Sequence, residues 1–347
     1  MKLKRLTAFC MSLALAGCAA NSRDSAQPSA TAVAESPVEV MLYAEASRPD
    51  RLGRIVVPVM LNEQGPFYFM LDTGSTHTVI AEKTLEQLGI PPDRSRLVTV
   101  RGVGAVKRVP TVLMQNVQAG TMQFSRVRMP VLNGLVLEDL DGILGMNTLG
   151  NHRVTADFIN EQIRISDVTG IPPDKRYSVV SFKTGMLAPT KLNSTPTELK
   201  RLSKPLITID AKVGDIRTRA VIDTGGAKTL GNPALLRALR RSAGGKLSTV
   251  PTEVADATDA RHPALMAPVP SLAFGPVAVK GLPIAFGDFS VFDLWNLNDR
   301  PTVLIGMDAL HLLDGLIIDY PRKELQITRV AGAHPATVPP AAVSVQH

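Results

Sequence analysis

The sequences FYFMLDTGS, at residues 67–75, and AVIDTGG, at residues 220–226, each place Asp-Thr-Gly directly after an apolar run. The apolar residues predict a buried strand, and the glycine predicts a tight turn that presents the aspartate at the edge of a loop. Two such loops brought face to face would place the carboxyl groups of Asp72 and Asp223 where they can share one proton. The pattern therefore predicts an acid/base pair that activates water.

The repeat extends well beyond the two Asp-Thr-Gly motifs. Each half carries an apolar strand before the motif, a short helix after it, an apolar-apolar-Gly segment and a closing pair of strands. These segments lie at residues 55–59, 82–88, 143–146 and 157–165 in the first half, and at 206–210, 233–241, 304–307 and 319–327 in the second. A common hairpin turn could explain one Asp-Thr-Gly motif, but the shared order of four segments favours two copies of one half-molecule.

The composition is consistent with this organisation. A chain of 347 residues with 45% hydrophobic residues can bury substantial cores, and its length favours two lobes over one. Aromatic residues make up only 4%, whereas Val, Ile, Leu, Gly and Pro are plentiful. Short strands joined by tight turns fit this composition better than a helical bundle does, so the expected fold is mostly β.

Across residues 54–329, the chain resembles the pepsin-like and retropepsin-like aspartic proteases, in particular bacterial retropepsin-like domains joined in tandem. The resemblance implies two β-barrel lobes with a few short helices and an active-site cleft between the lobes. One chain would supply both halves of the site, so no obligate dimer is implied. The implied reaction is hydrolysis of a protein or peptide substrate without a metal or cofactor.

The resemblance assigns catalysis to Asp72 and Asp223. The implied supporting residues belong to the same two loops: Thr73, Gly74, Ser75, Thr224, Gly225 and Gly226. The two threonines would hold the loops together through bonds from their hydroxyls to the backbone across the lobe interface. Ser75 would donate to Asp72, whereas Gly226 has no hydroxyl, so Asp223 is expected to be the harder of the two aspartates to ionise.

A mobile flap over the substrate is expected within residues 100–109, with Gly102, Val103 and Gly104 at its tip. The alternative is an ordinary glycine-containing hairpin. His77 lies close to Asp72 in sequence, and we interpret it as a surface turn residue rather than a catalytic base.

The amino terminus is typical of an export signal. Basic residues precede an apolar stretch at residues 6–16, and the sequence LAGC at residues 15–18 resembles the bacterial lipobox. Cleavage before Cys18 and lipidation of its thiol would anchor the protein in a membrane, and Ala19 resembles the pattern that sorts lipoproteins to the outer membrane. The expected location is the periplasmic face of that membrane. The alternative is an ordinary signal peptide with a chance cysteine.

The predicted organisation has six segments. They are a lipoprotein signal peptide at 1–17, a disordered tether at 18–47, an N-terminal lobe at 48–168, an interlobe connection at 169–204, a C-terminal lobe at 205–330 and a disordered tail at 331–347. The only other cysteine, Cys10, lies in the signal, so no disulfide is expected in the mature chain, and the six histidines show no metal-ligand spacing. Removal of residues 1–17, which contain three basic and no acidic residues, would reduce the net charge from +7 to a mild +4. The chain lacks the Lys/Arg clusters with interleaved aromatic residues that would indicate nucleic-acid binding.

Taken from sequence, the leading hypothesis is an aspartic endopeptidase of the bacterial cell envelope. The alternative is a catalytically weak or inactive peptide-binding lipoprotein with the same fold. Gly226 is the sequence feature that favours this alternative, because it removes one hydroxyl from the second loop.

Overall fold

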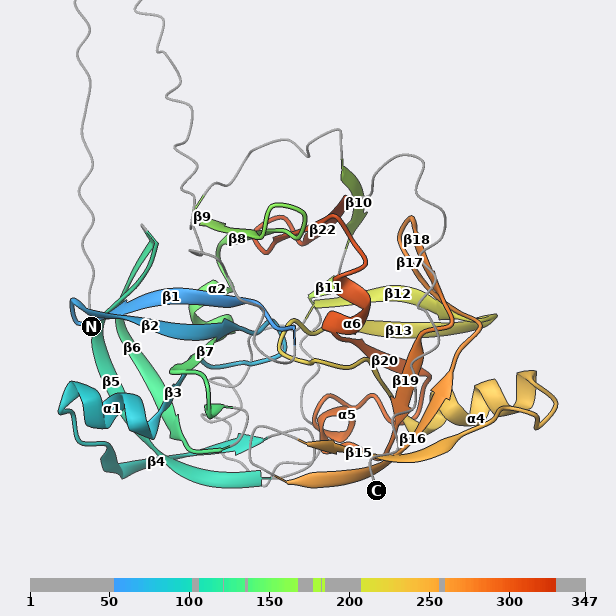
Figure 1. Cartoon of the computed structure of the whole chain (residues 1–347), viewed down its shortest axis with the longest axis horizontal. Coiled ribbons are helices and arrows are strands. Elements are labelled where there is room, and N and C mark those ends of the chain that lie inside the picture. Colours follow the sequence, from blue (N-terminus) through green and yellow to red (C-terminus); the bar gives the residue numbers. More distant parts are fainter. Residues whose placement is uncertain are drawn as a thin grey trace, which may run out of the picture. The chain divides into compact units, whose positions relative to one another are not determined.

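The computed structural model describes residues 53–101, 106–120, 122–134, 137–167, 177–181, 183–184, 207–255 and 260–328. The predicted signal, the tether with Cys18, the flap tip with Gly102, Val103 and Gly104, and the C-terminal tail all lie outside these residues. The described residues form a mostly β fold, as predicted (Figure 1). Among them, no helix is long and apolar enough to cross a membrane.

The first half forms a seven-stranded sheet that closes on itself. Its strand order is β1-β2-β7-β3-β6-β5-β4, and an additional pairing of β1 with β5 closes six strands into a barrel. The strands are β1 (Val56–Leu61), β2 (Gln64–Leu71), β3 (Val79–Ala81), β4 (Asp93–Arg101), β5 (Val106–Ala119), β6 (Met122–Leu132) and β7 (Gly142–Leu144). β4 pairs with β5 alone, and these two strands form the hairpin in which the flap was predicted.

The second half repeats this arrangement in a ten-stranded sheet. The strand order is β15-β16-β19-β14-β20-β13-β12-β17-β18, and β11 pairs with β12. The strands are β11 (Lys183–Thr184), β12 (Ile207–Val213), β13 (Ile216–Ile222), β14 (Leu230–Gly231), β15 (Val250–Ala255), β16 (Arg261–Pro268), β17 (Ser271–Phe274), β18 (Val277–Lys280), β19 (Pro283–Phe286) and β20 (Thr302–Ile305).

The strand register confirms the internal repeat. In the first half, β2 runs parallel to β7, with Leu71 opposite Leu144. In the second half, β13 runs parallel to β20, with Ile222 opposite Ile305. Each strand that ends at an Asp-Thr-Gly motif is therefore paired with the apolar-apolar-Gly segment of its own half.

The two halves differ in one long strand, which is continuous in the first half and divided in the second. The long strand β5 of the first half is continuous, but its counterpart is divided into β16 and β17 around Pro268 and Pro270. Proline has no N–H to donate to a strand ladder, and these two residues lie at the end of β16 and just before β17. The second half forms an open half-barrel rather than a closed one.

A third sheet joins segments from both halves. Its order is β10-β22-β21-β8-β9, formed by β8 (Arg153–Asp157), β9 (Gln162–Ser166), β10 (Tyr177–Ser181), β21 (Gly315–Asp319) and β22 (Glu324–Thr328). The closing strand pairs of the two halves meet where β8 pairs with β21, with Ala156 opposite Leu316. This pairing was not foreseen from the sequence, and the predicted lobe boundaries stay a prediction.

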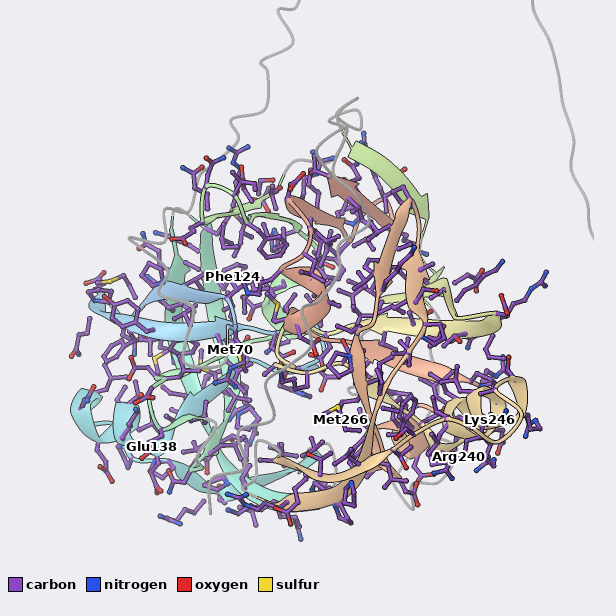
Figure 2. All side chains as sticks on the ribbon, turned by 45° about the vertical axis from the view of Figure 1, so that its right-hand side comes forward. Met70, Phe124, Glu138, Arg240, Lys246 and Met266 are labelled. Atoms are coloured by element: carbon purple, nitrogen blue, oxygen red, sulfur yellow. The ribbon has the colours of Figure 1, made fainter. Side chains whose placement is uncertain are left out.

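The two predicted helices form where expected. α1 (Glu82–Leu88) ends at Gly89, whose φ of 66° is favourable for glycine. α4 (Pro233–Ser242) begins with proline after Asn232, whose side chain accepts a hydrogen bond from the Leu235 N–H. Figure 2 shows Arg240 and Lys246 at the C-terminal end of α4, where cations complement the helix dipole. The remaining helices are single turns: α2 (Met146–Leu149), α5 (Ser290–Leu294) and α6 (Met307–Leu310).

The last three residues of each strand that leads to an aspartate are buried on both faces. In β2, Phe69 and Leu71 belong to the main hydrophobic core, while Met70 belongs to a smaller one that also contains Ile143. The matched residue of β13, Val221, packs in a second small core. Burial on both faces fixes the ends of these strands, and with them the positions of the two loops.

Candidate active site

Each Asp-Thr-Gly loop is fixed at its start by the neighbouring apolar-apolar-Gly segment. The backbone N–H of Asp72 donates to the carbonyl of Leu144 over 3.0 Å, and that of Asp223 donates to the carbonyl of Ile305 over 3.0 Å. The same bond at matched positions means that both aspartates leave their strands in the same way.

Two backbone N–H groups hold each carboxylate. Oδ1 of Asp72 accepts from Gly74 over 2.7 Å and from Ser75 over 3.0 Å. In the other loop, Oδ1 of Asp223 accepts from Gly225 and Gly226, both over 3.1 Å. These donors orient the carboxyl groups and favour their ionised forms.

The glycines of the two motifs allow the loops to approach face to face. A Cβ atom on Gly74 would lie 2.7 Å from Oδ1 of Asp223, and one on Gly225 would lie 2.3 Å from Cγ of Asp72. Each glycine therefore lies directly against the opposite aspartate, which leaves no space for a side chain. The same Cβ atom on Gly74 would lie 3.2 Å from Oδ1 of Asp72, so the two carboxyl groups lie on either side of one position.

The two threonines hold the loops together through a reciprocal set of bonds. The Thr73 hydroxyl donates to the carbonyl of Ile222 over 2.8 Å, and the Thr224 hydroxyl donates to that of Leu71 over 2.8 Å. Each hydroxyl also accepts from the backbone N–H of the other threonine, over 3.1 and 3.2 Å. Both threonines are buried, so the contacts that the resemblance implied are shielded from water.

Ser75 requires a correction. Its hydroxyl donates to the carbonyl of His77 over 2.8 Å, and only its backbone N–H reaches Asp72. The backbone N–H of Gly226 makes the equivalent bond to Asp223, so the missing hydroxyl at Gly226 does not deprive Asp223 of a donor. Ser75 supports the shape of its loop rather than the charge of the carboxylate.

The surroundings of the aspartates raise the pKa of both carboxyl groups. Both side chains are half-buried, so solvent reaches them although the protein replaces much of their hydration. Burial raises the pKa of Asp72, and its backbone donors and the Arg54 cation oppose this. Burial and the negative charge of Asp72 raise the pKa of Asp223 to about 7. The negative charge of Asp72 thus makes Asp223 harder to ionise, whereas the sequence analysis expected the missing hydroxyl of Gly226 to have this effect.

Comparison with family models agrees with this geometry. A model described as aspartyl protease matches residues 57–148 and 209–309, together more than half of the chain. The chain belongs to the aspartyl protease family. Each match contains one Asp-Thr-Gly loop and its apolar-apolar-Gly segment, as expected for two aspartyl protease lobes in tandem. The comparison with curated proteins found no match.

Two pairs of residues that were not predicted from sequence hold the chain just after each loop of this aspartyl protease fold. The Thr78 N–H donates to Oδ1 of Asn147 over 2.6 Å, and the Thr229 N–H donates to Oδ2 of Asp308 over 3.1 Å. The Thr229 hydroxyl also donates to Oδ1 of Asp308 over 2.6 Å. The signal that could have found them is their matched placement, because Asn147 and Asp308 both follow Gly-Met.

The glycine before each of these Met residues is required by close packing. A Cβ atom on Gly145 would lie 2.3 Å from the carbonyl oxygen of His77, and one on Gly306 would lie 2.5 Å from that of Lys228. The following residues, Met146 and Met307, donate their backbone N–H groups to the loops. This segment therefore supports the loop in both lobes of the aspartyl protease fold.

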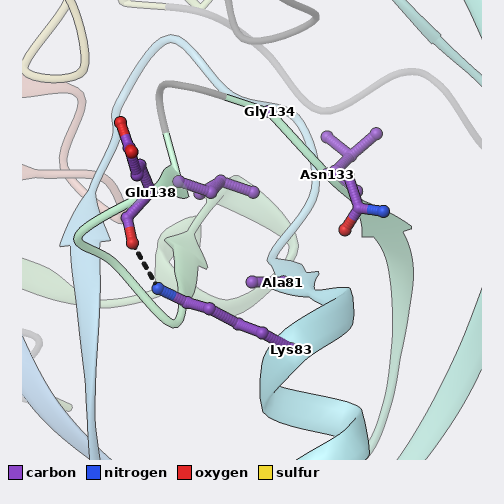
Figure 3. Close-up of a pocket in the computed structure, with 7 residues that line it drawn as sticks. Ala81, Lys83, Asn133, Gly134 and Glu138 are labelled. Carbon is purple, nitrogen blue, oxygen red and sulfur yellow. Dashed lines mark hydrogen bonds between the residues drawn. The ribbon is translucent and has the colours of Figure 1, made fainter.

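A separate pocket lies in the first lobe, between α1 and the turn after β6 (Figure 3). The Lys83 ammonium crosses it and donates to the backbone carbonyl of Glu138 over 2.6 Å. None of its lining residues belongs to the Asp-Thr-Gly loops, so it is not part of the candidate active site. Among the described residues, no three His, Cys, Asp or Glu side chains gather as a metal-ligand set.

Proposed function

We propose that the protein is an aspartic endopeptidase in which Asp72 and Asp223 together activate a water molecule for attack on a peptide bond. One observation carries the proposal: the two carboxyl groups face each other at half-buried positions, and two backbone N–H groups orient each of them. Membership of the aspartyl protease family supports it.

The reaction follows from the proton that the pair shares. Because burial and the charge of Asp72 raise the pKa of Asp223 to about 7, the pair carries a single negative charge between the pKa of Asp72 and about pH 7. The ionised carboxylate takes a proton from water while the water oxygen bonds to the scissile carbonyl carbon. The protonated carboxyl group gives its proton to the carbonyl oxygen. Proton transfer to the amide nitrogen then allows the C–N bond to break without a covalent enzyme intermediate.

The substrate class is a protein or peptide, since the pair acts on an amide bond and needs no further co-reactant than water. Both aspartates come from one chain, so a single protein molecule completes the site.

A cleavage assay tests the activity. The full-length protein is incubated with a mixture of peptides at several pH values, and new termini are identified by mass spectrometry. We expect cleavage that Asp72→Asn abolishes and that the control Asp215→Asn, an exposed aspartate in the turn between β12 and β13, leaves unchanged. Cleavage that persists at full rate in Asp72→Asn would contradict the proposal.

The structure weakens the sequence argument for the alternative function, a lipoprotein that binds peptides without cleaving them. Its sequence argument was that the second loop lacks a hydroxyl donor, but the backbone N–H of Gly226 donates to Asp223 over the same distance as that of Gly225. A wild-type protein that binds peptides and cleaves none of them would restore this alternative.

The proposal places the enzyme in the bacterial cell envelope, with a lipid anchor at Cys18 on the periplasmic face of the outer membrane. The support is the signal-like sequence of residues 1–17 and the LAGC motif that ends at Cys18. Cys18→Ser should move the protein from the membrane fraction to the soluble periplasmic fraction, because a lost acyl anchor leaves no second attachment. Unchanged membrane association would remove the anchor from the proposal.

A further inference from the structure

The segment that leads into β1 brings a cation to one side of the candidate active site. The carbonyl of Ile55 accepts a hydrogen bond from the Leu71 N–H over 2.9 Å, which places the segment beside the residue that precedes Asp72. The carbonyl of Gly53 is in contact with Nε2 of His311, at the end of α6. Arg54 lies between these two fixed points and is only 6% exposed. Val56 is paired with Met70 in the antiparallel register of β1 and β2, and continuing this register places Arg54 opposite Asp72. A buried arginine is thus fixed by its backbone beside Asp72.

The internal repeat shows that this cation is not matched on the other side. With Asp72 placed on Asp223, the position that corresponds to Arg54 is Pro205, which carries no charge. The two loops are otherwise alike in their backbone donors, so Arg54 is a source of asymmetry between two nearly equivalent carboxyl groups.

The other titratable groups near the pair are Tyr320, His77 and Asp308, and Asp308 has the uncharged Asn147 as its counterpart. The Tyr320 hydroxyl, buried after β21, is affected by the charge of Asp72 but is itself neutral in its usual form. On the supporting elements, the ring of His77 is hydrogen-bonded to the Thr76 hydroxyl. Asp308 is bonded to Thr229, and burial raises the pKa of this carboxyl group. Arg54 is the cation whose charge acts on Asp72.

We propose that Arg54 is a positioning residue that keeps the negative charge of the pair on Asp72 and the shared proton on Asp223. The inference rests on the proposed peptidase function and adds a division of roles to it. Asp72 would be the group that takes the proton from water, and Asp223 the group that protonates the scissile carbonyl oxygen. After this step the proton from water is on Asp72 and the charge is on Asp223. Both return to their starting places when Asp72 protonates the leaving amine and Asp223 takes a proton from the tetrahedral intermediate.

The direction in which the pH profile should move depends on which aspartate ionises at each limb of the profile. Removing the Arg54 charge makes ionised Asp72 less favourable, so the pKa of Asp72 should rise. The low-pH limb of kcat/KM should then move to higher pH. The high-pH limb belongs mainly to the ionisation of Asp223 and should move less. A purely structural role for Arg54 would lower the rate at every pH and leave both limbs in place.

The direct test is a titration of the aspartate carboxyl groups in the full-length protein. The protein is labelled with ¹³C at aspartate Cγ, and the signals are assigned with Asp72→Asn and Asp223→Asn. We expect Arg54→Met to raise the pKa of Asp72 more than that of Asp223, and Arg54→Lys to restore the wild-type value. The control Arg237→Met removes one positive charge from the exposed side of α4 and should leave both titrations unchanged.

The outcomes separate this inference from the peptidase proposal. An Asp72 titration that does not move in Arg54→Met, or an Asp223 titration that moves as far, would overturn the role of Arg54. The titration needs no substrate, so it is decisive even where no cleavage is found, whereas absence of Asp72-dependent cleavage overturns the function. If Arg54→Met does not fold, Arg54→Gln keeps polar donors without the charge and should give the same shift.

Discussion

At the residue scale, the chemistry depends on two carboxyl groups that are alike in their backbone donors but unlike in their charged neighbours. Asp72 has a cation nearby, while the chief charged neighbour of Asp223 is the ionised Asp72. In the proposed mechanism this difference leaves the proton on one carboxyl group and the charge on the other, so that the same loop sequence would supply both an acid and a base.

The raised pKa of Asp223 predicts how the stability of the fold depends on pH. A carboxyl group whose pKa is about 7 in the folded state and near 3.9 in the unfolded chain binds more protons when folded, so stability falls as pH rises between these values. Asp223→Asn removes the buried like charge. Its gain in melting temperature over the wild type should therefore be larger at pH 8 than at pH 4. Calorimetry at both pH values measures this, and a gain that is equal at both would show that Asp223 ionises normally.

The aspartates, the threonines and the glycines could be predicted from sequence because each acts within a short repeated motif. The target of the Ser75 hydroxyl could not be predicted, because Asp72 and the carbonyl of His77 are both within two or three residues of it. Arg54 was missed because it acts across a strand pairing that brings residue 55 next to residue 71, and no local pattern marks that contact.

At the element scale, the two halves follow the repeat where local signals specify the chain. α1 ends at Gly89 and α4 begins after Asn232, as their capping residues predicted. The third sheet is different, because β8 and β21 are more than 150 residues apart and their pairing leaves no local trace.

Asn232 connects α4 to the strand system behind the second loop, which predicts a cost greater than that of an ordinary helix cap. Its amide oxygen accepts from the N–H groups of Leu235 and Thr302, and its amide nitrogen donates to the carbonyls of Leu297 and Arg300. Asn232→Ala leaves these buried groups without partners and should lower the free energy of unfolding by about 2 kcal/mol or more. Urea unfolding measures this free energy. The control is Ser242→Ala at the exposed end of α4, which should change the free energy of unfolding little. A loss below about 0.5 kcal/mol would show that Asn232 caps nothing essential.

At the scale of the whole molecule, the third sheet joins the two halves of the chain through a buried ion pair. Arg153 on β8 donates through Nε and a terminal nitrogen to Oδ2 of Asp319 on β21, over 3.1 and 2.7 Å. Arg153 is 4% exposed and Asp319 is fully buried. The two residues are direct partners in the β8–β21 register, so the ion pair fixes how the closing strands of the halves align.

Breaking this ion pair should destabilise the protein strongly, because the buried Arg153 loses the counter-charge that Asp319 provides. Asp319→Asn should lower the free energy of unfolding by about 3–5 kcal/mol, and replacing both residues in Arg153→Met with Asp319→Leu should recover much of the loss. Denaturant unfolding of the single and double variants tests this. A double variant as unstable as the single one would contradict the electrostatic explanation.

The most direct test of the central claim compares the two aspartates singly and together. If Asp72 and Asp223 act as one proton-sharing unit, Asp72→Asn and Asp223→Asn should each reduce kcat/KM for a cleaved peptide by about as much as the double substitution does. All three variants should remain folded, as judged by circular dichroism. Losses that multiply in the double variant, or full activity in either single variant, would contradict the shared-proton mechanism.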